Sequence, residues 1–297
     1  MSRPGEGWSC GAAFSPRVET RGGIGFRVVT VRYIDDMLLN DVSSNLGVAA
    51  RPTVVCVPCF SGAPWDLQVL TGLDGLVTRT MRLPDDIADV DAYANVLAEQ
   101  IQDLDSYILV GDSFGAVISL ALAARQPKGL VGLVLSGGFA ANPLPRWKGV
   151  AAKLSRFANG ALYRHGTLRF HAFQLASHFD AAAEVPHTQN DYRNLFAQNT
   201  SRSSYTARVS SVTQFNMLSD LAQIRVPTLV LTPADDRLVG AHAARQLLDG
   251  IRQSSEIVLP ETGHMFRFTH PTLYSNTIRA FVDSLQPVDA SARGVAS

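Results

Sequence analysis

The stretch that most constrains the fold of this chain is the pentapeptide Gly-Asp-Ser-Phe-Gly at residues 111–115. An apolar run precedes it at 107–110, and a long apolar segment of helical character follows it at 116–125. A Gly-x-Ser-x-Gly sequence between a strand and a helix is typical of a nucleophile elbow, a sharp turn that holds the serine at its apex in a strained conformation. The pattern therefore predicts that the hydroxyl of Ser113 is exposed at the carboxyl edge of a sheet.

The neighbours of Ser113 in this turn each meet a structural requirement. Gly111 and Gly115 are needed because a Cβ atom at either position would collide with the adjoining strand or helix. Asp112 separates the first glycine from the serine. Phe114 begins the helix, so its backbone N–H points to where an oxyanion could form. The elbow is thus expected to supply a nucleophile and one donor of an oxyanion hole.

The composition of the chain disfavours several classes of protein. The chain has 297 residues, 46% hydrophobic and 18% charged, so it can bury a full core and a disordered protein is excluded. Its formal net charge of zero gives no bulk attraction to nucleic acid or to an anionic membrane. No apolar run reaches the roughly 18 residues of a membrane span, and residues 1–22 lack a secretory signal, so a mobile tail is expected there. The three cysteines form no disulfide framework, which favours a reducing cytoplasm.

Strand-like and helix-like segments alternate along most of the chain. Short apolar or alternating runs predict strands at 26–33, 52–57, 77–83, 106–111, 130–135, 228–232 and 256–259. Helical spacing of apolar residues occurs at 67–73, 89–104, 116–125, 241–251 and 274–285. This alternation predicts an α/β protein with a doubly wound, mostly parallel sheet that helices cover on both faces.

One segment, 139–220, breaks this alternation and has the character of several helices without a strong strand. We expect it to be a helical insertion over the carboxyl edge of the sheet. The sheet domain itself is then made of residues 23–138 and 221–287. The small and polar residues 288–297 are expected to form a disordered tail.

Two later loops offer partners for Ser113. In a doubly wound sheet, groups that meet the serine must come from loops at the same edge. The strand at 228–232 is followed by a loop with two acids, Asp235 and Asp236, and the next expected strand is followed by a loop that ends in His264. Serine, acid, histidine is the chain order of one class of Ser-His-Asp triad.

In such a triad His264 takes the proton of Ser113 and later gives it to the leaving group. The acid holds the imidazole in the required tautomer and stabilises the imidazolium. The alternative is a loop histidine that caps the end of its strand. The order and placement of all three elements favour the triad.

Over residues 26–285 the chain resembles an α/β-hydrolase-fold serine hydrolase with a helical cap. The run Leu-Thr-Pro-Ala-Asp-Asp-Arg-Leu-Val at 231–239 is similar to the acid loop of that family, which typically ends in Asp-x-x-Val. The resemblance implies that Asp236 is the triad acid and that Asp235 is a neighbour. Pro-Glu-Thr-Gly-His-Met at 260–265 is similar to the family's histidine loop.

One loop departs from the family pattern. Members usually carry His-Gly-x after the third strand, whereas this chain has Pro58-Cys59-Phe60. An oxyanion hole needs only a backbone N–H at that point, so the resemblance implies that Phe60 donates alongside Phe114. Whether the loop approaches the elbow closely with Cys59 in place of glycine is left open.

Four apolar residues are candidates for the wall of a substrate pocket. Trp65 lies where relatives often place an aromatic side chain near the acyl group, and a packed core indole is the alternative. Phe173, Phe215 and Met217 belong to the insertion, where the core of the insertion itself is the alternative.

The resemblance implies hydrolysis of a small-molecule carboxylic ester through an acyl-enzyme, without a cofactor. The same triad serves thioesters, lactones, methyl esters bound to a carrier protein and some C–C bonds, and the sequence does not separate these substrates. A serine nucleophile disfavours the epoxide hydrolases and haloalkane dehalogenases of this fold, which use an aspartate. A ligand receptor that has lost turnover is the alternative from another class, and the complete triad argues against it. Nothing in the sequence indicates an oligomeric state.

Two further patterns are less specific. Cys56 and Cys59 form a C-x-x-C, but Cys56 lies in an expected buried strand and not at a helix N-terminus, which disfavours redox use. His165, His171 and His178 lack a fourth convergent ligand, so helix-surface histidines are favoured over zinc ligands. We therefore expect no metal site.

The first half of the insertion is basic. Between Phe139 and Phe179 there is no Asp or Glu, whereas six cations occur there: Arg146, Lys148, Lys153, Arg156, Arg164 and Arg169. A solvated helix face is the simpler interpretation. The alternative hypothesis is that this segment guides an anionic substrate, or an acidic carrier protein, toward Ser113.

Overall fold

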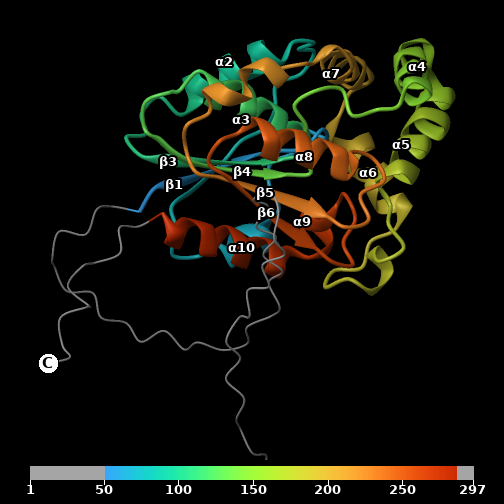
Figure 1. Ribbon diagram of the computed structural model, residues 1–297. Helices are drawn as coiled ribbons and strands as arrows, with labels where there is room; N and C mark the ends of the chain where they lie inside the picture. Colours follow the sequence, from blue (N-terminus) through green and yellow to red (C-terminus); the bar gives the residue numbers. More distant parts are fainter. Residues whose placement is uncertain (1–50, 286–297) are drawn as a thin grey trace, which may run out of the picture.

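In the computed structural model, which describes residues 51–285, six strands form one sheet in the order β2-β1-β3-β4-β5-β6 (Figure 1). Every neighbouring pair is parallel, and the predicted doubly wound sheet is confirmed. The strands are β1 (Thr53–Val57), β2 (Thr78–Thr80), β3 (Tyr107–Asp112), β4 (Leu130–Ser136), β5 (Thr228–Pro233) and β6 (Ser254–Leu259). The strand expected at 26–33 and the tails expected at 1–22 and 288–297 lie outside the described residues.

Helices cover both faces of this sheet (Figure 1). One face is covered by α2 (Val90–Gln100), α3 (Phe114–Ala124) and α8 (Gly240–Gly250). The other face is covered by α1 (Leu67–Gly72), the short α9 (Phe266–Thr269) and α10 (Pro271–Ser284). The bounds of α1, α2, α3, α8 and α10 are close to those that the apolar spacing predicts, whereas α9 was not predicted.

Successive side chains of a strand point to opposite faces of the sheet. Because helices cover both faces, the central strands are buried on both sides. In β1, Val55 and Val57 belong to the core under α2 and α3, whereas Val54 and Cys56 belong to the core under α1 and α10. Helix α3 is itself buried along its whole length, which accounts for its almost entirely apolar sequence. The sheet and α3 therefore form a rigid base for the loops at the carboxyl edge.

The edge strand β2 is shorter than the strand predicted at 77–83. After Thr80 the chain leaves the sheet, and the backbone N–H of Leu83 donates to the carbonyl oxygen of Gly62 at 3.0 Å. Met81 and Leu83 still reach the core, with exposures of 9% and 5%. Their burial in irregular structure explains why this segment has the composition of a longer strand.

Between β4 and β5 the chain forms a series of helices. Among the described residues these are α4 (Arg146–Leu154), η1 (Ser155–Phe157), η2 (Leu162–Thr167), α5 (Leu168–Leu175), η3 (Asp180–Ala182), α6 (Gln189–Asn199), α7 (Arg202–Gln214) and η4 (Leu218–Gln223). Helices α4, α5 and α6 lie beyond one end of the sheet (Figure 1). A bridge between Ala141 and Asn216 joins the points where the chain leaves the sheet domain and returns to it. We call residues 139–220 the inserted segment.

No helix among residues 51–285 is both long enough and apolar enough to cross a bilayer.

Candidate active site

The turn between β3 and α3 is strained at Ser113. This residue has φ 54° and ψ −111°, a conformation that is rare for a residue with a side chain. A Cβ atom on Gly111 would come within 2.5 Å of the backbone of Ala116, and one on Gly115 would overlap the carbonyl oxygen of Val57. The two glycines thus allow β1, β3 and α3 to meet closely enough to hold the serine in this conformation.

Three polar side chains meet at this edge in a continuous chain of hydrogen bonds. The Oγ of Ser113 lies 2.8 Å from Nε2 of His264, and Nδ1 of His264 lies 2.7 Å from Oδ2 of Asp236. The second carboxylate oxygen, Oδ1, accepts the backbone N–H groups of Leu238 and Val239, both at 2.9 Å. Since both of its oxygens are engaged, the carboxylate holds the imidazole with Nε2 toward the serine.

Burial and mutual charge act in opposite directions on the two buried members of this chain. Burial by itself lowers the pKa of His264 and raises the pKa of Asp236. The opposite charge and the hydrogen bond between them outweigh burial, so the net pKa of His264 is raised and that of Asp236 is lowered. Asp236 is therefore ionised, and it favours the imidazolium that forms when the histidine accepts a proton.

The neighbouring carboxylate has other partners. Asp235 accepts the hydroxyl of Ser177 at 2.6 Å and lies 3.2 Å from Nδ1 of His178 and 3.3 Å from the guanidinium of Arg237. Ser177 and His178 belong to the inserted segment. Asp235 therefore joins this loop to the inserted segment, whereas Asp236 contacts the histidine.

A buried arginine of α7 holds the loop after β1. Arg208 is fully buried. Its guanidinium donates, over 3.0 to 3.2 Å, to the carbonyl oxygens of Phe60, Ser61 and Pro84 and to the hydroxyl of Tyr93. A Cβ atom on Gly62, whose φ is 74°, would come within 2.7 Å of this guanidinium. The inserted segment thus fixes the backbone around Phe60, one of the two expected oxyanion donors.

Cys59, at the position where the family usually has glycine, is a buried thiol. It is 3% exposed, and its Sγ lies 3.3 Å from Oγ of Ser61. Burial raises the pKa of Cys59, and the nearby charge of Asp112 raises it further. Burial also raises the pKa of Cys56 to about 12. Both thiols are therefore protonated at neutral pH, which is unfavourable for redox chemistry or metal binding.

A second buried arginine supports the elbow, and the sequence reasoning missed it. The Nε of Arg267 donates to Oδ2 of Asp112 at 2.7 Å, and its Nη1 donates to Oδ2 of Asp66 at 2.7 Å. Its guanidinium also lies over the ring of Trp65, 5.1 Å from the centroid. Arg267 follows His264 by only three residues, so α9 connects the histidine loop to the residue before the serine. The only signal in the sequence is one cation in the run Met-Phe-Arg-Phe.

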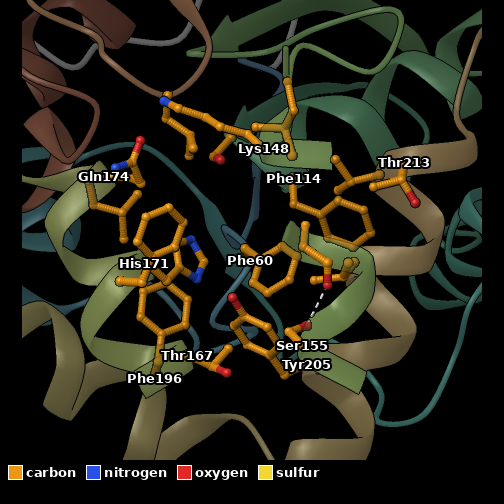
Figure 2. Close-up of a pocket in the computed structure, with 18 of the residues that line it drawn as sticks. Phe60, Phe114, Lys148, Ser155, Thr167, His171, Gln174, Phe196, Tyr205 and Thr213 are labelled. Atoms are coloured by element: carbon orange, nitrogen blue, oxygen red, sulfur yellow. Dashed lines mark hydrogen bonds between the residues drawn. The ribbon is translucent and has the colours of Figure 1, made fainter. Parts of the chain in front are cut away.

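A cavity of about 420 Å³ lies beside the serine and the histidine (Figure 2). Ser113 and His264 both line it. The rest of its wall is mainly apolar and comes from the elbow, the loop after β1 and the inserted helices, including Phe60, Phe114, Leu154, Leu162, Phe196 and Val209. A volume of this size suits a small organic molecule.

Two of the four candidate pocket residues belong to other parts of the molecule. Trp65 does not line the cavity; it is 4% exposed and packs against Tyr274, with 5.4 Å between ring centroids. Phe173 is 57% exposed. It lies on α5 two residues after His171, which does line the cavity, and residues two apart point to different sides of a helix.

The other two candidates lie where the inserted segment returns to the sheet domain. Phe215 and Met217 flank Asn216, which pairs with Ala141, and both pack into the core under α2 and α3. They line a second hollow, of about 530 Å³, whose wall does not include Ser113. They are thus separate from the cavity beside the serine.

The basic residues of the inserted segment divide into two groups. Lys148 lines the cavity, and its Nζ donates to the carbonyl oxygen of Arg237 at 3.3 Å. Four other cations have exposed side chains that are not part of the cavity wall: Lys153, Arg156, Arg164 and Arg169. Among the described cations of this stretch, Lys148 is therefore the one placed to meet a bound molecule.

Known proteins that are similar to this chain include two named as hydrolases and one named as an esterase. "Putative carbamate hydrolase RutD" of Pseudomonas syringae pv. syringae (strain B728a) is 24% identical over 188 residues, covering 62% of this chain and 70% of that protein. The "2-hydroxy-6-oxononadienedioate/2-hydroxy-6-oxononatrienedioate hydrolase 2" of Pseudomonas putida is 26% identical over 215 residues, covering 70% and 72%. The structure of a thermophilic esterase from Thermogutta terrifontis superposes with a TM-score of 0.68 at 17% identity, covering 80% of this chain and 91% of that one.

A family model described as "Serine aminopeptidase, S33" matches residues 71–268, which include the elbow, the inserted segment, the acid loop and the histidine loop. The chain therefore belongs to this family and is an α/β-hydrolase-fold hydrolase.

Proposed function

We propose that this hydrolase cleaves carboxylic esters through an acyl-enzyme, with Ser113 as nucleophile, His264 as general base and Asp236 as the orienting acid. The observation that carries the proposal is the chain of hydrogen bonds from Oγ of Ser113 to Nε2 of His264 at 2.8 Å and from Nδ1 to Asp236 at 2.7 Å, beside a cavity that a small molecule can enter. This is the geometry that makes a serine hydroxyl nucleophilic at neutral pH.

In the first half of the reaction, Nε2 of His264 removes the hydroxyl proton while Oγ of Ser113 attacks the carbonyl carbon of the ester. The carbonyl oxygen becomes an oxyanion, which the backbone N–H groups of Phe60 and Phe114 stabilise. When the intermediate collapses, the imidazolium gives its proton to the departing alkoxide. The acyl group remains bonded to Oγ.

In the second half, a water molecule takes the place of the alcohol. His264 removes one of its protons as the water oxygen attacks the acyl carbon, and the same two N–H groups stabilise the second oxyanion. Collapse breaks the bond to Oγ and releases the acid. The proton returns from the imidazolium to Ser113, so the enzyme regains its starting state.

The inserted segment has two parts in this proposal. We propose that residues 139–220 act as a helical cap, because this segment contributes most of the residues that line the cavity. Through Arg208 the cap also holds the loop that carries Phe60. The expectation of a reducing cytoplasm is compatible with two buried free cysteines, Cys56 and Cys59.

A fluorophosphonate probe tests the assignment directly. It reacts with an activated serine, so we expect mass spectrometry of a digest to find the label on Ser113, and we expect hydrolysis of aryl esters to stop in proportion to labelling. Label on a different residue, or full activity after stoichiometric labelling of Ser113, would refute the assignment.

A second candidate is hydrolysis of a C–C bond in an oxo-dicarboxylate on the same triad. The relative from Pseudomonas putida is named for a dioate of this kind, and Lys148 lines the cavity of this chain. A panel of aryl esters of increasing acyl length, run beside acyl-thioesters, lactones, a carbamate and an oxo-dicarboxylate, separates these substrate classes. Values of kcat/KM that are highest for the oxo-dicarboxylate would replace ester hydrolysis with this candidate.

A further inference from the structure

The cavity wall contains a buried polar group that has no hydrogen-bond partner. His171, on α5, lines the cavity, and its Nδ1 is buried without a partner among the described residues. The ring packs against the aromatic rings of the wall, 4.6 Å from Phe196 and 5.3 Å from Phe60 between centroids. A buried polar atom without a partner costs about 1–3 kcal/mol, so it is normally satisfied by protein, water or ligand.

A hydroxyl group lies next to this imidazole. Tyr205, on α7, also lines the cavity, and its ring is 5.5 Å from that of His171 between centroids. Figure 2 shows its hydroxyl end directed toward the side of the cavity where His171 lies. The two residues come from different helices of the inserted segment, and both contact Phe60, whose backbone belongs to the proposed oxyanion hole.

Both groups are uncharged. Burial lowers the pKa of His171 to about 3, and the charge of His264 lowers it further. Burial raises the pKa of Tyr205, and the nearby Tyr163 raises it further. A neutral imidazole has one donor and one acceptor, and a phenol hydroxyl can donate or accept. Neither group attracts an anion, so the partner they suit is a neutral oxygen.

We propose that His171 and Tyr205 form a recognition site for an uncharged carbonyl or hydroxyl group on the otherwise apolar part of the substrate that occupies the cavity. This inference rests on the proposed ester hydrolysis, which it refines by naming the substrate class. The preferred substrate is then an ester whose acyl chain is mainly apolar and carries one oxo or hydroxy substituent. An unsubstituted chain would leave the imidazole unpaired in the complex as well.

Matched ester pairs test this proposal. The substrates are aryl esters of a straight-chain acid and of its mono-oxo and mono-hydroxy derivatives, with the oxygen moved one carbon at a time along the chain. We expect kcat/KM to be at least about tenfold higher for the derivatives whose oxygen reaches His171 and Tyr205 than for the plain ester of equal length. A set in which no position gains over the plain ester would overturn the proposal.

Variants of His171 and Tyr205 test whether these two residues cause the preference for oxygenated esters. His171→Phe and Tyr205→Phe should each reduce the ratio between oxygenated and plain esters toward one, and His171→Gln, which keeps a donor and an acceptor, should retain part of it. Thr213→Val is the matched control, because Thr213 also lines the cavity but its hydroxyl already donates to the carbonyl oxygen of Ser210 at 3.2 Å. A ratio that falls equally in the Thr213 variant, or that survives in both His171→Phe and Tyr205→Phe, would contradict the assignment.

A binding experiment keeps the inference independent of the proposed reaction. Carboxamides that correspond to the oxygenated and plain esters resist rapid hydrolysis, and calorimetry gives their Kd for the wild type and for His171→Phe. If no ester is hydrolysed but the oxygenated amide binds about tenfold more tightly only to the wild type, the proposed function fails and the recognition site stands. If esters are hydrolysed but the two amides bind equally, the recognition site fails alone.

Discussion

At the carboxyl edge of the sheet, Ser113, His264 and Asp236 all have hydrogen-bond partners, whereas in the cavity wall Nδ1 of His171 is buried without one among the described residues. The edge is built from strand ends and tight turns, where these three side chains pair with one another. The wall is built mainly from the inserted segment, in which Nδ1 of His171 is unpaired among aromatic side chains. The difference indicates that the edge is arranged for the reacting atoms and the wall for the rest of the substrate.

The first way to test this division is to remove the nucleophile. Ser113→Ala should lower kcat by a factor on the order of 10⁴ or more, because the hydroxyl forms the covalent bond. Circular dichroism and thermal unfolding should show an intact fold, and Ser113→Gly should raise Tm because glycine relieves the strain at φ 54°. Activity within tenfold of the wild type in Ser113→Ala would place the chemistry elsewhere.

The second test separates the two aspartates. Asp236→Asn should lower kcat by a factor on the order of 10³–10⁴ by leaving the imidazole without its orienting carboxylate. Asp235→Asn, the control, should lower kcat far less, since Asp235 contacts Ser177 and Arg237 and not His264. The opposite ranking would assign the role of triad acid to Asp235.

The wild type and Asp236→Asn should also differ in the pH dependence of kcat/KM. His264 must be neutral to accept a proton, so kcat/KM rises with pH through the pKa of this residue. Because the net pKa of His264 is raised above 6.5, the acid limb of the wild type should lie above pH 6.5. In Asp236→Asn the charge and hydrogen bond of Asp236 are lost and only the charge of Asp112 still opposes burial, so the pKa of His264 falls and the limb should move to lower pH. A limb at the same pH in both proteins would exclude His264 as the group that titrates.

The third test concerns the residue that connects the two regions. Arg208→Lys keeps a positive charge but cannot reproduce the hydrogen bonds that the guanidinium makes to Phe60, Ser61 and Pro84. We expect kcat to fall by about 10–100-fold with a smaller change in KM, because a displaced oxyanion donor affects the transition state more than the bound ester. Binding of an aryl boronate, which imitates that transition state, should weaken by a similar factor.

Arg202→Lys is the matched control for this effect. Arg202 is on the same helix, but its guanidinium donates to the carbonyl oxygens of Ala158 and Arg156, within the inserted segment. We expect little change in kcat. If both lysine variants lose kcat equally, the loss reflects general loosening of α7 and not the position of Phe60.

The smallest expected effect concerns the charge of the wall. Lys148→Glu should lower kcat/KM for esters that carry a carboxylate by about fivefold and leave neutral esters of similar size nearly unchanged. Added salt should reduce the difference between the two ester classes in the wild type. Lys153→Glu is the control, because Lys153 is exposed and does not line the cavity. Equal effects of both variants would mean that net charge matters and the position of Lys148 does not.

The edge was more predictable from the sequence than the wall. The elbow and the histidine loop are compact patterns in which a few adjacent residues determine backbone geometry, as Gly111 and Gly115 do around Ser113. Strands such as β1 and β3 are recognisable because a sheet buried on both faces needs continuous apolar runs. The oxyanion role proposed for Phe60 comes from the resemblance to the family, although the loop around it departs from the family's usual residues.

The wall was less predictable because its residues depend on contacts between distant segments. Phe173 and His171 are two residues apart on the same helix, and only the packing of α5 determines that the histidine faces the cavity. The buried arginines are harder still. Arg208 binds carbonyl oxygens 148 and 147 residues away, and Arg267 binds a carboxylate 155 residues away, so nothing near either arginine indicates its partner.

The position of Arg208 in the chain has a consequence for biosynthesis. The residues that form β1, the loop with Phe60 and the elbow leave the ribosome well before α7, and a nascent chain that ends before Arg208 lacks the side chain that holds this loop. We therefore expect the loop with Phe60 to become ordered only after α7 has been synthesised, and esterase activity to appear later still, once Asp236 and His264 have been added. Limited proteolysis of ribosome-bound chains truncated on either side of α7 would show whether the loop becomes protected once Arg208 is present.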